Sequence, residues 1–260
     1  MNRLRIATWN IAGGRKARSA QRFDYHGRDL GYFAEQLRAI AADVVCLQEV
    51  EYAAGEDFAA QLADSAGLPH VFQTPMHASH IDTNYDLAQV MLSRRPLAKQ
   101  RAVPQPYPAF PLHRPNGEPA QRFVKYLQVA ELDGVQIGNV QTQPLEFLGT
   151  PYESENGRRY AAEVGDMFIR ELCPPVLLAG DFCADLHTRH VVDIYGPACA
   201  ALLLHDALPP GYTKPYGAGR PDALFASPEF RVIDSAIVPT ETGHFLCWAE
   251  LAYADIREGE

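Results

Sequence analysis

Five polar residues lie at the ends of apolar segments of this sequence, at positions from which their side chains reach the rim of a folded sheet. They are Asn10, Glu49, Asp181, Asp222 and His244. A bare carboxylate beside a buried strand is costly unless it is paired or bound to a cation, and open sheets place their chemistry at strand ends. If these five groups converge, they form a site for a hard divalent cation, which prefers oxygen ligands and keeps several waters.

Each of the five residues also has an ordinary structural explanation. Asn10 can cap a turn, Glu49 can lie on the surface, and Asp181 and Asp222 follow a glycine and a proline, which are common in turns. His244 follows a glycine and can be a half-buried histidine with a satisfied hydrogen bond. Taken singly, each residue fits its ordinary explanation better, whereas the series as a whole favours a site.

The segments that must position these residues follow a layered α/β pattern. Strands are predicted at residues 4–11, 44–50, 87–93, 123–132, 135–142, 174–182, 223–227, 230–238 and 244–252. Helices are predicted at residues 30–42, 56–67 (ending at Gly67) and 158–172, and residues 187–204 are expected to be partly helical. With no linker or repeat in the sequence, we expect one α/β domain over residues 1–260.

Two polar segments interrupt this pattern. Residues 15–28 read as an arginine-rich connection without a helix or strand pattern. Residues 103–119 are rich in proline and cannot join a central strand. This second segment is therefore predicted to be either a surface Ω-type loop or a flap that faces the substrate.

Composition narrows the range of partners and compartments. Lys and Arg total 23 and Asp and Glu total 32, which gives a net charge of −9. This balance disfavours a protein that holds nucleic acid over a broad surface, but it allows a local cationic site. Five cysteines without a CxxC pair favour a reducing compartment. Without a signal-peptide pattern or a run of about 18 apolar residues, we expect a cytoplasmic protein with no membrane segment.

The sequence resembles the endonuclease/exonuclease/phosphatase superfamily of metal-dependent phosphoesterases. The matching segments, in the order of the family, are RIATWNIAGG, DVVCLQEV, DLAQVMLSRRPL, GNVQTQPL, PVLLAGDFCAD, GRPDALFAS and TGHFLCWAEL. The most specific are LQEV after an aspartate-led strand and an apolar strand that ends in GDF. The resemblance covers nearly the whole chain and implies a DNase-like fold, a four-layered α/β/β/α sandwich of two mostly antiparallel sheets.

The resemblance also implies roles for the five strand-end residues. Glu49 and Asn10 would hold a Mg²⁺ or Mn²⁺ ion, Glu49 directly, and Asp181 would position or activate the attacking water. His244 would act as an acid/base or contact the phosphate, and Asp222 would keep its ring oriented. The implied reaction is phosphodiester or phosphomonoester hydrolysis, which needs charge neutralisation, an in-line water and help for the leaving oxygen.

Three positions depart from the pattern of this family and predict a modified site. The family usually reads GDFN, THL and an Asp-His pair, where this chain has Cys183, Gln143 and Gly243. A thiol is a poor hydrogen-bond donor to phosphate, the glutamine replaces a histidine, and the glycine removes a carboxylate expected near the metal. We assign Gln143, Cys183 and Arg94 to substrate binding.

Cations near the matching segments are candidates for phosphate contacts. They are Arg94, Arg95, Arg122 and Lys125, although a solvated strand edge explains each of them as well. Because the net charge is −9, a small phosphorylated substrate is expected rather than a long polyanion.

Two other hypotheses remain open from the sequence. One is a scaffold repurposed for other small-molecule chemistry, in which Cys183 acts as a nucleophile only if its thiolate is stabilised, and Asp181 and Asp185 oppose this. The other is a non-catalytic binding protein with a degenerate site. The retained acids argue against it, because without a metal their mutual repulsion favours their replacement.

Overall fold

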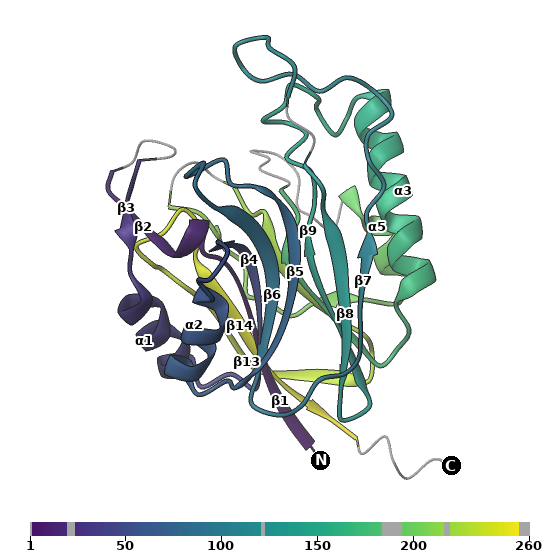
Figure 1. Cartoon of the computed structure of the whole chain (residues 1–260). Helices are drawn as coiled ribbons and strands as arrows, with labels where there is room; N and C mark the ends of the chain where they lie inside the picture. Colours follow the sequence, from purple (N-terminus) through teal and green to yellow (C-terminus); the bar gives the residue numbers. More distant parts are fainter. Residues whose placement is uncertain (1, 20–23, 121–122, 184–193, 216–218, 255–260) are drawn as a thin grey trace.

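The first of two sheets is formed by apolar segments from both ends of the chain. The structure is a computed structural model that describes residues 2–19, 24–120, 123–183, 194–215 and 219–254. Within them, the sheet has the strand order β13-β14-β1-β4-β6-β5, and β1 and β4 are its parallel pair (Figure 1). Its strands are β1 (Asn2–Asn10), β4 (Val44–Tyr52), β5 (His70–Ala78), β6 (Asp86–Ser93), β13 (Phe230–Val238) and β14 (Leu246–Tyr253).

The second sheet is formed by the middle of the chain and has the strand order β11-β12-β10-β9-β8-β7. β9 and β10 are its parallel pair. Asp133 and Gly134 both have positive φ, as expected for the predicted tight turn between β8 and β9. The strands are β7 (Ala98–Pro104), β8 (Tyr126–Leu132), β9 (Val135–Gln141), β10 (Val176–Asp181), β11 (His205–Asp206) and β12 (Asp222–Ala226).

Helices cover the outer face of each sheet. α1 (Leu30–Ile40) and α2 (Phe58–Ala66) pack on the first sheet, and α3 (Glu155–Glu171) and α5 (Gly196–Ala201) pack on the second (Figure 1). The amphipathic stripe that predicted α1 buries Phe33, Leu37 and Ile40 against the first sheet. α2 ends at Gly67 in the left-handed conformation, as expected. The predicted four-layered sandwich of two mostly antiparallel sheets is therefore confirmed.

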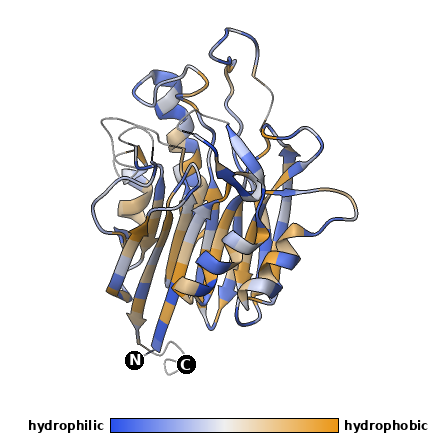
Figure 2. Cartoon of the chain, turned by 90° about the vertical axis from the view of Figure 1, so that its left-hand side faces the viewer, coloured by the Kyte–Doolittle hydropathy of each residue, from blue (hydrophilic) through white to orange (hydrophobic). Residues whose placement is uncertain are grey.

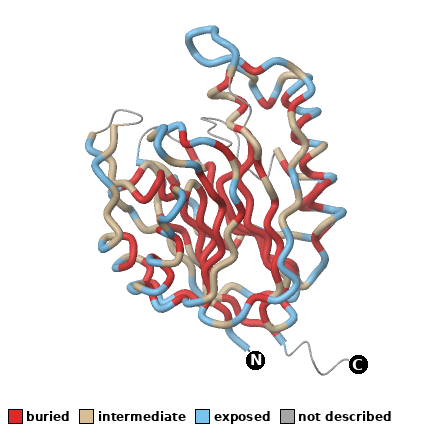
Figure 3. The backbone as a smooth tube through the Cα atoms, in the orientation of Figure 1, coloured by how far each residue is buried: buried red, intermediate tan, exposed pale blue. Residues whose placement is uncertain are grey.

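The buried residues are concentrated in the strands (Figure 3). Hydropathy follows the same division, with hydrophobic strands and hydrophilic loops above them (Figure 2). One group of buried polar residues lies between the sheets: Gln48, Gln89, Gln128 and Asn139, which we call the amide network. Asn139 Nδ2 donates to Gln128 Oε1 at 2.9 Å and Gln48 Nε2 donates to Asn139 Oδ1 at 2.8 Å. The Gln48–Asn139 bond ties β4 to β9 across the interface, and the Asn139–Gln128 bond extends the network to β8 within the second sheet.

Several elements differ from the sequence-based expectation. The arginine-rich connection contains a short hairpin, β2 (Arg15–Ala17) and β3 (Tyr25–Arg28), after a single 3-10 turn η1 (Ala12–Gly14). β5 and β7 had no clear signal, because both are edge strands with many part-exposed or exposed positions. The segment predicted to be partly helical is residues 187–204. Residues 187–193 lie outside the described residues, and the remainder contains α5. Among those described, no helix is long and apolar enough to span a lipid bilayer.

Candidate active site

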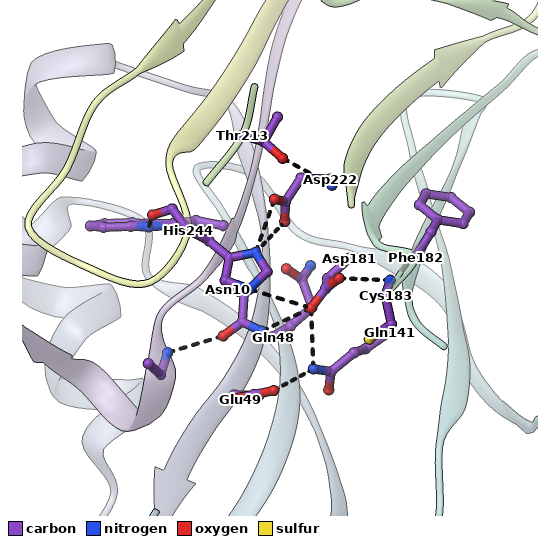
Figure 4. Close-up of polar contacts among 12 residues, drawn as sticks. Asn10, Gln48, Glu49, Gln141, Asp181, Phe182, Cys183, Thr213, Asp222 and His244 are labelled. Atoms are coloured by element: carbon purple, nitrogen blue, oxygen red, sulfur yellow. Dashed lines mark hydrogen bonds and ion pairs between the residues drawn. The ribbon is translucent and has the colours of Figure 1, made fainter. Parts of the chain in front are cut away.

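The carboxyl ends of the two central parallel strand pairs meet at one rim of the sandwich. β1 and β4 bring Asn10 and Glu49 there, and β9 and β10 bring Gln141 and Asp181. Asn10 Nδ2 donates to Asp181 Oδ2 at 2.9 Å, and Gln141 Nε2 donates to Glu49 Oε1 at 2.6 Å (Figure 4). The rim of each sheet is thus bonded to the rim of the other. With Asp222 and His244, these four residues form what we call the rim cluster.

The local backbone explains how Asp181 and Glu49 reach this rim. Gly180 has φ +155°, and a Cβ there would lie 1.9 Å from the Val140 carbonyl oxygen of the neighbouring strand. Only glycine therefore fits directly before Asp181. Glu49 lies in a bulge of β4 opposite β6 and has φ +54°. Bulges of this kind redirect a side chain, and here Glu49 points to the rim.

His244, just before β14 of the first sheet, is held by Asp222 at the start of β12 in the second sheet. His244 Nδ1 lies 2.9 and 3.0 Å from the two carboxylate oxygens of Asp222, so the Nδ1 proton is donated to that carboxylate. Trp9 Nε1 donates to the His244 carbonyl oxygen at 3.1 Å, which fixes the backbone of this residue. His244 Nε2 lies 3.9 Å from Asp181 Oδ2. The imidazole is therefore oriented by one carboxylate and presents its other nitrogen toward a second one.

The charges of the rim cluster shift its pKa values in different directions. Burial alone would raise the pKa of Asp181, but the positive charges of His244 and Lys214 outweigh it and lower that pKa. Burial alone would lower the pKa of His244, but Asp222 and Asp181 outweigh it and raise that pKa. Burial raises the pKa of Asp222, against the attraction of His244. Asp181 is therefore ionised at neutral pH, and the two carboxylates favour the protonated form of His244.

Glu49 supplies a carboxylate on the other side of the rim cluster. Burial alone would raise its pKa, but the positive charges of His80 and Lys125 outweigh it and lower the pKa. His80 Nε2 lies 3.7 Å from Glu49 Oε2, and the Glu49 side chain is 14% exposed. Glu49 is therefore an ionised carboxylate that a ligand can reach.

Two sets of oxygen and nitrogen donors are available to a cation. Glu49 and Asn10 offer oxygen atoms, as a hard divalent ion requires, and the Gln141 amide donates to Glu49 and, at 3.5 Å, to Asp181. The Gln141 NH₂ group, which is the positive end of the amide dipole, thus lies between the carboxylates of Glu49 and Asp181. The same position between two carboxylates suits a cation. Ligand atoms of Asp181, Asp222 and His244 also lie within 4.8 Å of one another, but Asp222 is engaged by His244.

The rim cluster opens into a cavity of about 600 Å³. Five of its members line this cavity: Asn10, Glu49, Gln141, Asp181 and His244. The proline-rich segment contributes Arg114 and Pro115 to the lining. Two residues of this segment thus face the cavity, as the prediction of a flap requires.

Two of the altered positions lie in the cavity wall. Cys183 lines the cavity, and its backbone N–H donates to Asp181 Oδ1 at 2.8 Å. Burial and the charge of Asp181 raise the pKa of the Cys183 thiol well above its ordinary value. The thiol is therefore neutral, which contradicts a role for Cys183 as a nucleophile. Gly243 also lines the cavity.

Gln143, the third altered position, does not line the cavity. Its side chain is buried, and Gln143 Nε2 donates to the Phe123 carbonyl oxygen at 2.6 Å. Phe123 does line the cavity. The prediction that Gln143 contacts substrate is therefore corrected: its amide supports a wall residue instead.

The candidate arginines lie elsewhere. Arg94 Nε donates to the Ala42 carbonyl oxygen at 2.8 Å, beside the start of β4 and so at the opposite end of that strand from Glu49. The structure therefore contradicts the assignment of Arg94 to substrate binding. Arg95 forms an ion pair with Asp133 in the β8–β9 turn, also away from the rim. Arg122 lies outside the described residues.

Several cavity residues lie outside the five predicted site residues, although Lys125 was among the candidate phosphate contacts. Gln141 ends a predicted strand, as the other rim residues do, so the same rule would have found it. Lys125 is buried at 5% exposure, unlike a solvated edge residue, and its Nζ donates to Gln141 Oε1 at 2.5 Å. Lys214, His77 and His80 also line the cavity. His77 lies on β5 and His80 lies just after it, and the sequence carried little signal for this strand.

Comparisons with known proteins agree with this geometry. The model of the Endonuclease/Exonuclease/phosphatase family matches residues 7–242. A comparison with the curated proteins finds no match.

Solved structures of low sequence identity share the fold. An endonuclease/exonuclease/phosphatase from Beutenbergia cavernae is 19% identical at a TM-score of 0.73, over 98% of this chain and 72% of that one. A second one, from Bacteroides vulgatus, is 15% identical at a TM-score of 0.67, over 98% and 100% of the two chains. The human Nocturnin catalytic domain with bound sulfate is 15% identical at a TM-score of 0.62, over 97% and 94%. At these identities, the likeness concerns the fold.

Proposed function

The chain belongs to the endonuclease/exonuclease/phosphatase family, and we propose that it is a divalent-metal-dependent phosphoesterase with a modified active site. The observation that carries this proposal is the convergence of Glu49, Asp181 and His244 on one cavity, with Asp222 behind the histidine. Family membership supports metal-dependent phosphoester hydrolysis in general. The residues of the rim cluster support the roles given below.

Glu49 and Asn10 are the proposed metal ligands. Glu49 offers an ionised carboxylate. Among the described residues, Asn10 Oδ1 accepts one bond, at 3.1 Å from the Ala12 N–H, which leaves a lone pair. Mg²⁺ or Mn²⁺ suits this oxygen set. A divalent ion, when bound, neutralises charge on the phosphate oxygens.

Asp181 and His244 are the proposed acid–base pair. Asp181 is ionised and held by Asn10 Nδ2 and the Cys183 N–H, so one carboxylate oxygen can orient a water and accept its proton. His244 Nε2 is the proposed proton donor to a phosphate or leaving-group oxygen, because Asp222 and Asp181 raise the pKa of the imidazole and so favour its protonated form. Asp222 keeps the imidazole oriented.

The proposed substrate is a small phosphorylated molecule. A cavity of about 600 Å³ lies in the range of small-molecule sites, and the net charge of −9 opposes binding of a long polyanion. Lys125 and Lys214 add local positive charge to the cavity. We also propose a single domain and a cytoplasmic location, and five free cysteines, three of them buried, support the reducing compartment.

Metal titration followed by a turnover assay tests the proposal. Mg²⁺ or Mn²⁺ should raise the melting temperature of the wild type and leave that of Glu49→Gln unchanged, since a ligand that binds only the folded state stabilises it. Glu35→Gln, at an exposed position of α1, is the matched control and should respond like the wild type. Turnover of p-nitrophenyl phosphate or bis-p-nitrophenyl phosphate should be lost in His244→Ala. A wild type with neither a metal response nor turnover would refute the proposal.

A further inference from the structure

The cavity has a charged floor and, on one side, an apolar wall. Phe123, Pro144, Phe147 and Leu148 form this wall. Phe123 and Phe147 are partly buried and pack against the core between the second sheet and α3, and Leu148 belongs to that core. The wall is therefore part of the packed structure and does not depend on a free loop.

One side chain, that of His80, separates the apolar wall from the proposed metal ligand Glu49. The Phe123 ring centroid lies 6.3 Å from that of His80, and His80 Nε2 lies 3.7 Å from Glu49 Oε2. Lys125 Nζ lies 6.0 Å from the Phe123 ring centroid. A phosphate bound beside Glu49 thus places the group esterified to it next to Phe123, with Lys125 at the junction.

The groups around Phe123 favour a ring over a polyol. Its ring centroid lies 4.8 Å from that of His77, and burial lowers the pKa of His77 to about 3, so this neighbour is neutral. Sugar or inositol hydroxyls placed against phenylalanine, proline and leucine would lose hydrogen bonds to water without replacement. A planar ring instead gains an offset or edge contact with Phe123. The cavity is also much larger than a phosphate group needs.

We propose that Phe123 and Phe147 form a subsite for a planar aromatic or heteroaromatic ring in the organic part of the phosphoester, and that Lys125 binds the phosphate at the junction. This subsite proposal rests on the proposed function, because it takes the phosphate to lie at the rim cluster. Lys125 suits its role because its ammonium is buried and Gln141 accepts one of its three N–H donors. The ring is that of a nucleobase or of a phenol, since both present the same planar face.

Binding of matched ligand pairs tests the subsite. AMP and ribose 5-phosphate differ by the base, and phenyl and cyclohexyl phosphate differ by planarity at similar size. Dissociation constants are measured by calorimetry with Mn²⁺ in His244→Ala, whose turnover is blocked. In at least one pair, the ligand with the planar ring should bind about tenfold more tightly, as one aromatic contact allows. The pair that discriminates identifies nucleobase or phenol as the source of the ring.

Variants in the same background assign the preference to the wall. Phe123→Ala should abolish it and Phe123→Leu, which keeps bulk without a ring, should reduce it. Phe110→Ala is the matched control, because Phe110 packs against the same core without lining the cavity and should keep the preference. If Phe123→Ala fails to fold, Phe123→Leu decides. Lys125→Met should weaken all four ligands alike.

The outcomes separate this inference from the proposed function. Equal affinity within both pairs, no binding of any of the four ligands, or a preference that survives Phe123→Leu and Phe123→Ala, would overturn the subsite, even if the wild type hydrolyses chromogenic phosphoesters. A ring preference that depends on Phe123, in a protein without turnover under any metal, would uphold the subsite and refute the hydrolase.

Discussion

The amide network and the rim cluster occupy neighbouring layers of the same interface between the sheets, yet they satisfy their polar groups differently. In the network, neutral amides bond to one another and to backbone carbonyls. In the rim cluster, three carboxylates face one imidazole and two amides. The network is nearly self-contained, whereas the rim cluster holds an excess of negative charge beside a cavity. This difference assigns stability to the first region and ligand chemistry to the second.

The sharpest test of this contrast is Asp222→Asn in the rim cluster. The expected result is a fall in kcat of about 10²–10⁴, because His244 loses the carboxylate that stabilises its protonated form. The free energy of unfolding should fall by no more than about 3 kcal/mol, the lower end of the cost of removing one partner of a buried ion pair, because the amide oxygen of the variant still accepts the His244 Nδ1 proton. Steady-state kinetics and urea unfolding measure the two effects.

A control for this test comes from an exposed aspartate of the same fold. Asp234→Asn on β13 removes the same charge at an exposed position and should leave kcat unchanged. Wild-type kcat in Asp222→Asn would show that the rim cluster is structural, and the contrast between the regions would fail.

The converse variant is Asn139→Leu in the amide network. It leaves the Gln128 side-chain carbonyl without its donor and removes the Asn139 bonds to the backbone carbonyls of Leu47 and Val90. The Gln48 amide loses one acceptor and keeps Thr8 Oγ1 and the Cys46 carbonyl oxygen. Because a buried polar group without a partner costs about 1–3 kcal/mol, the free energy of unfolding should fall by about 3 kcal/mol. Under conditions where the variant is folded, kcat should stay within about twofold of the wild type.

Urea unfolding and kinetics at a temperature well below melting measure these effects. Gln100→Leu on the exposed edge strand β7 is a matched amide control and should change neither quantity. If Asn139→Leu lost kcat while keeping its stability, the network would be part of the catalytic machinery, and the division between the two regions would be wrong.

The sequence predicted the central strands of this fold better than its edges. β4 and β10 are buried at nearly every position, so their apolar runs were readable without context. β5 and β7 are partly exposed edge strands, and β5 also contains Pro75. Their place in the sheets depends on pairing with β6 and β8, which a local pattern does not encode.

The site was predictable to the extent that its residues end readable strands. Asn10, Glu49 and Asp181 follow from that rule, and the resemblance added their roles. Lys125 could not be distinguished from a surface lysine, because its burial depends on the packing of distant segments. Gln143 was misassigned for the same reason, since sequence position does not show that its side chain supports the cavity wall.

His77 shares one property with each region. Its side chain is ionisable, as in the rim cluster, but it is neutral in the folded protein, as in the amide network. Burial lowers its pKa from 6.5 to about 3. Below pH 6.5, the unfolded chain takes up a proton that the folded protein refuses until about pH 3, so stability falls as the pH falls through this window. The loss approaches about 1.4 kcal/mol per pH unit.

The variant His77→Asn keeps a donor for the Ala78 carbonyl oxygen, which His77 Nδ1 contacts at 2.9 Å, and does not titrate in this range. Between pH 6.5 and 5, it should therefore lose about 2 kcal/mol less stability than the wild type. Urea unfolding at a series of pH values measures the slopes. Parallel slopes would show that His77 is protonated in the folded protein, and would remove the neutral surroundings assigned to Phe123.

The smallest expected effect concerns Cys183, where the rim cluster meets the altered cavity wall. Cys183 has φ +46°, in the left-handed region that asparagine tolerates better than most residues. Cys183→Asn therefore fits the existing backbone and replaces a weak thiol donor with an amide N–H facing the cavity. We expect kcat/KM for p-nitrophenyl phosphate to rise about tenfold, the equivalent of one hydrogen bond to a charged group.

Two companion variants determine what such a gain would mean. Cys183→Ala should leave kcat/KM unchanged, because it removes the thiol without adding a donor. Gln143→His restores the family residue at a position that does not line the cavity, so it should give no gain even in combination with Cys183→Asn. A gain from Gln143→His would mean that this side chain reaches the substrate after all. An unchanged rate in Cys183→Asn would mean that the departure at this position does not limit hydrolysis.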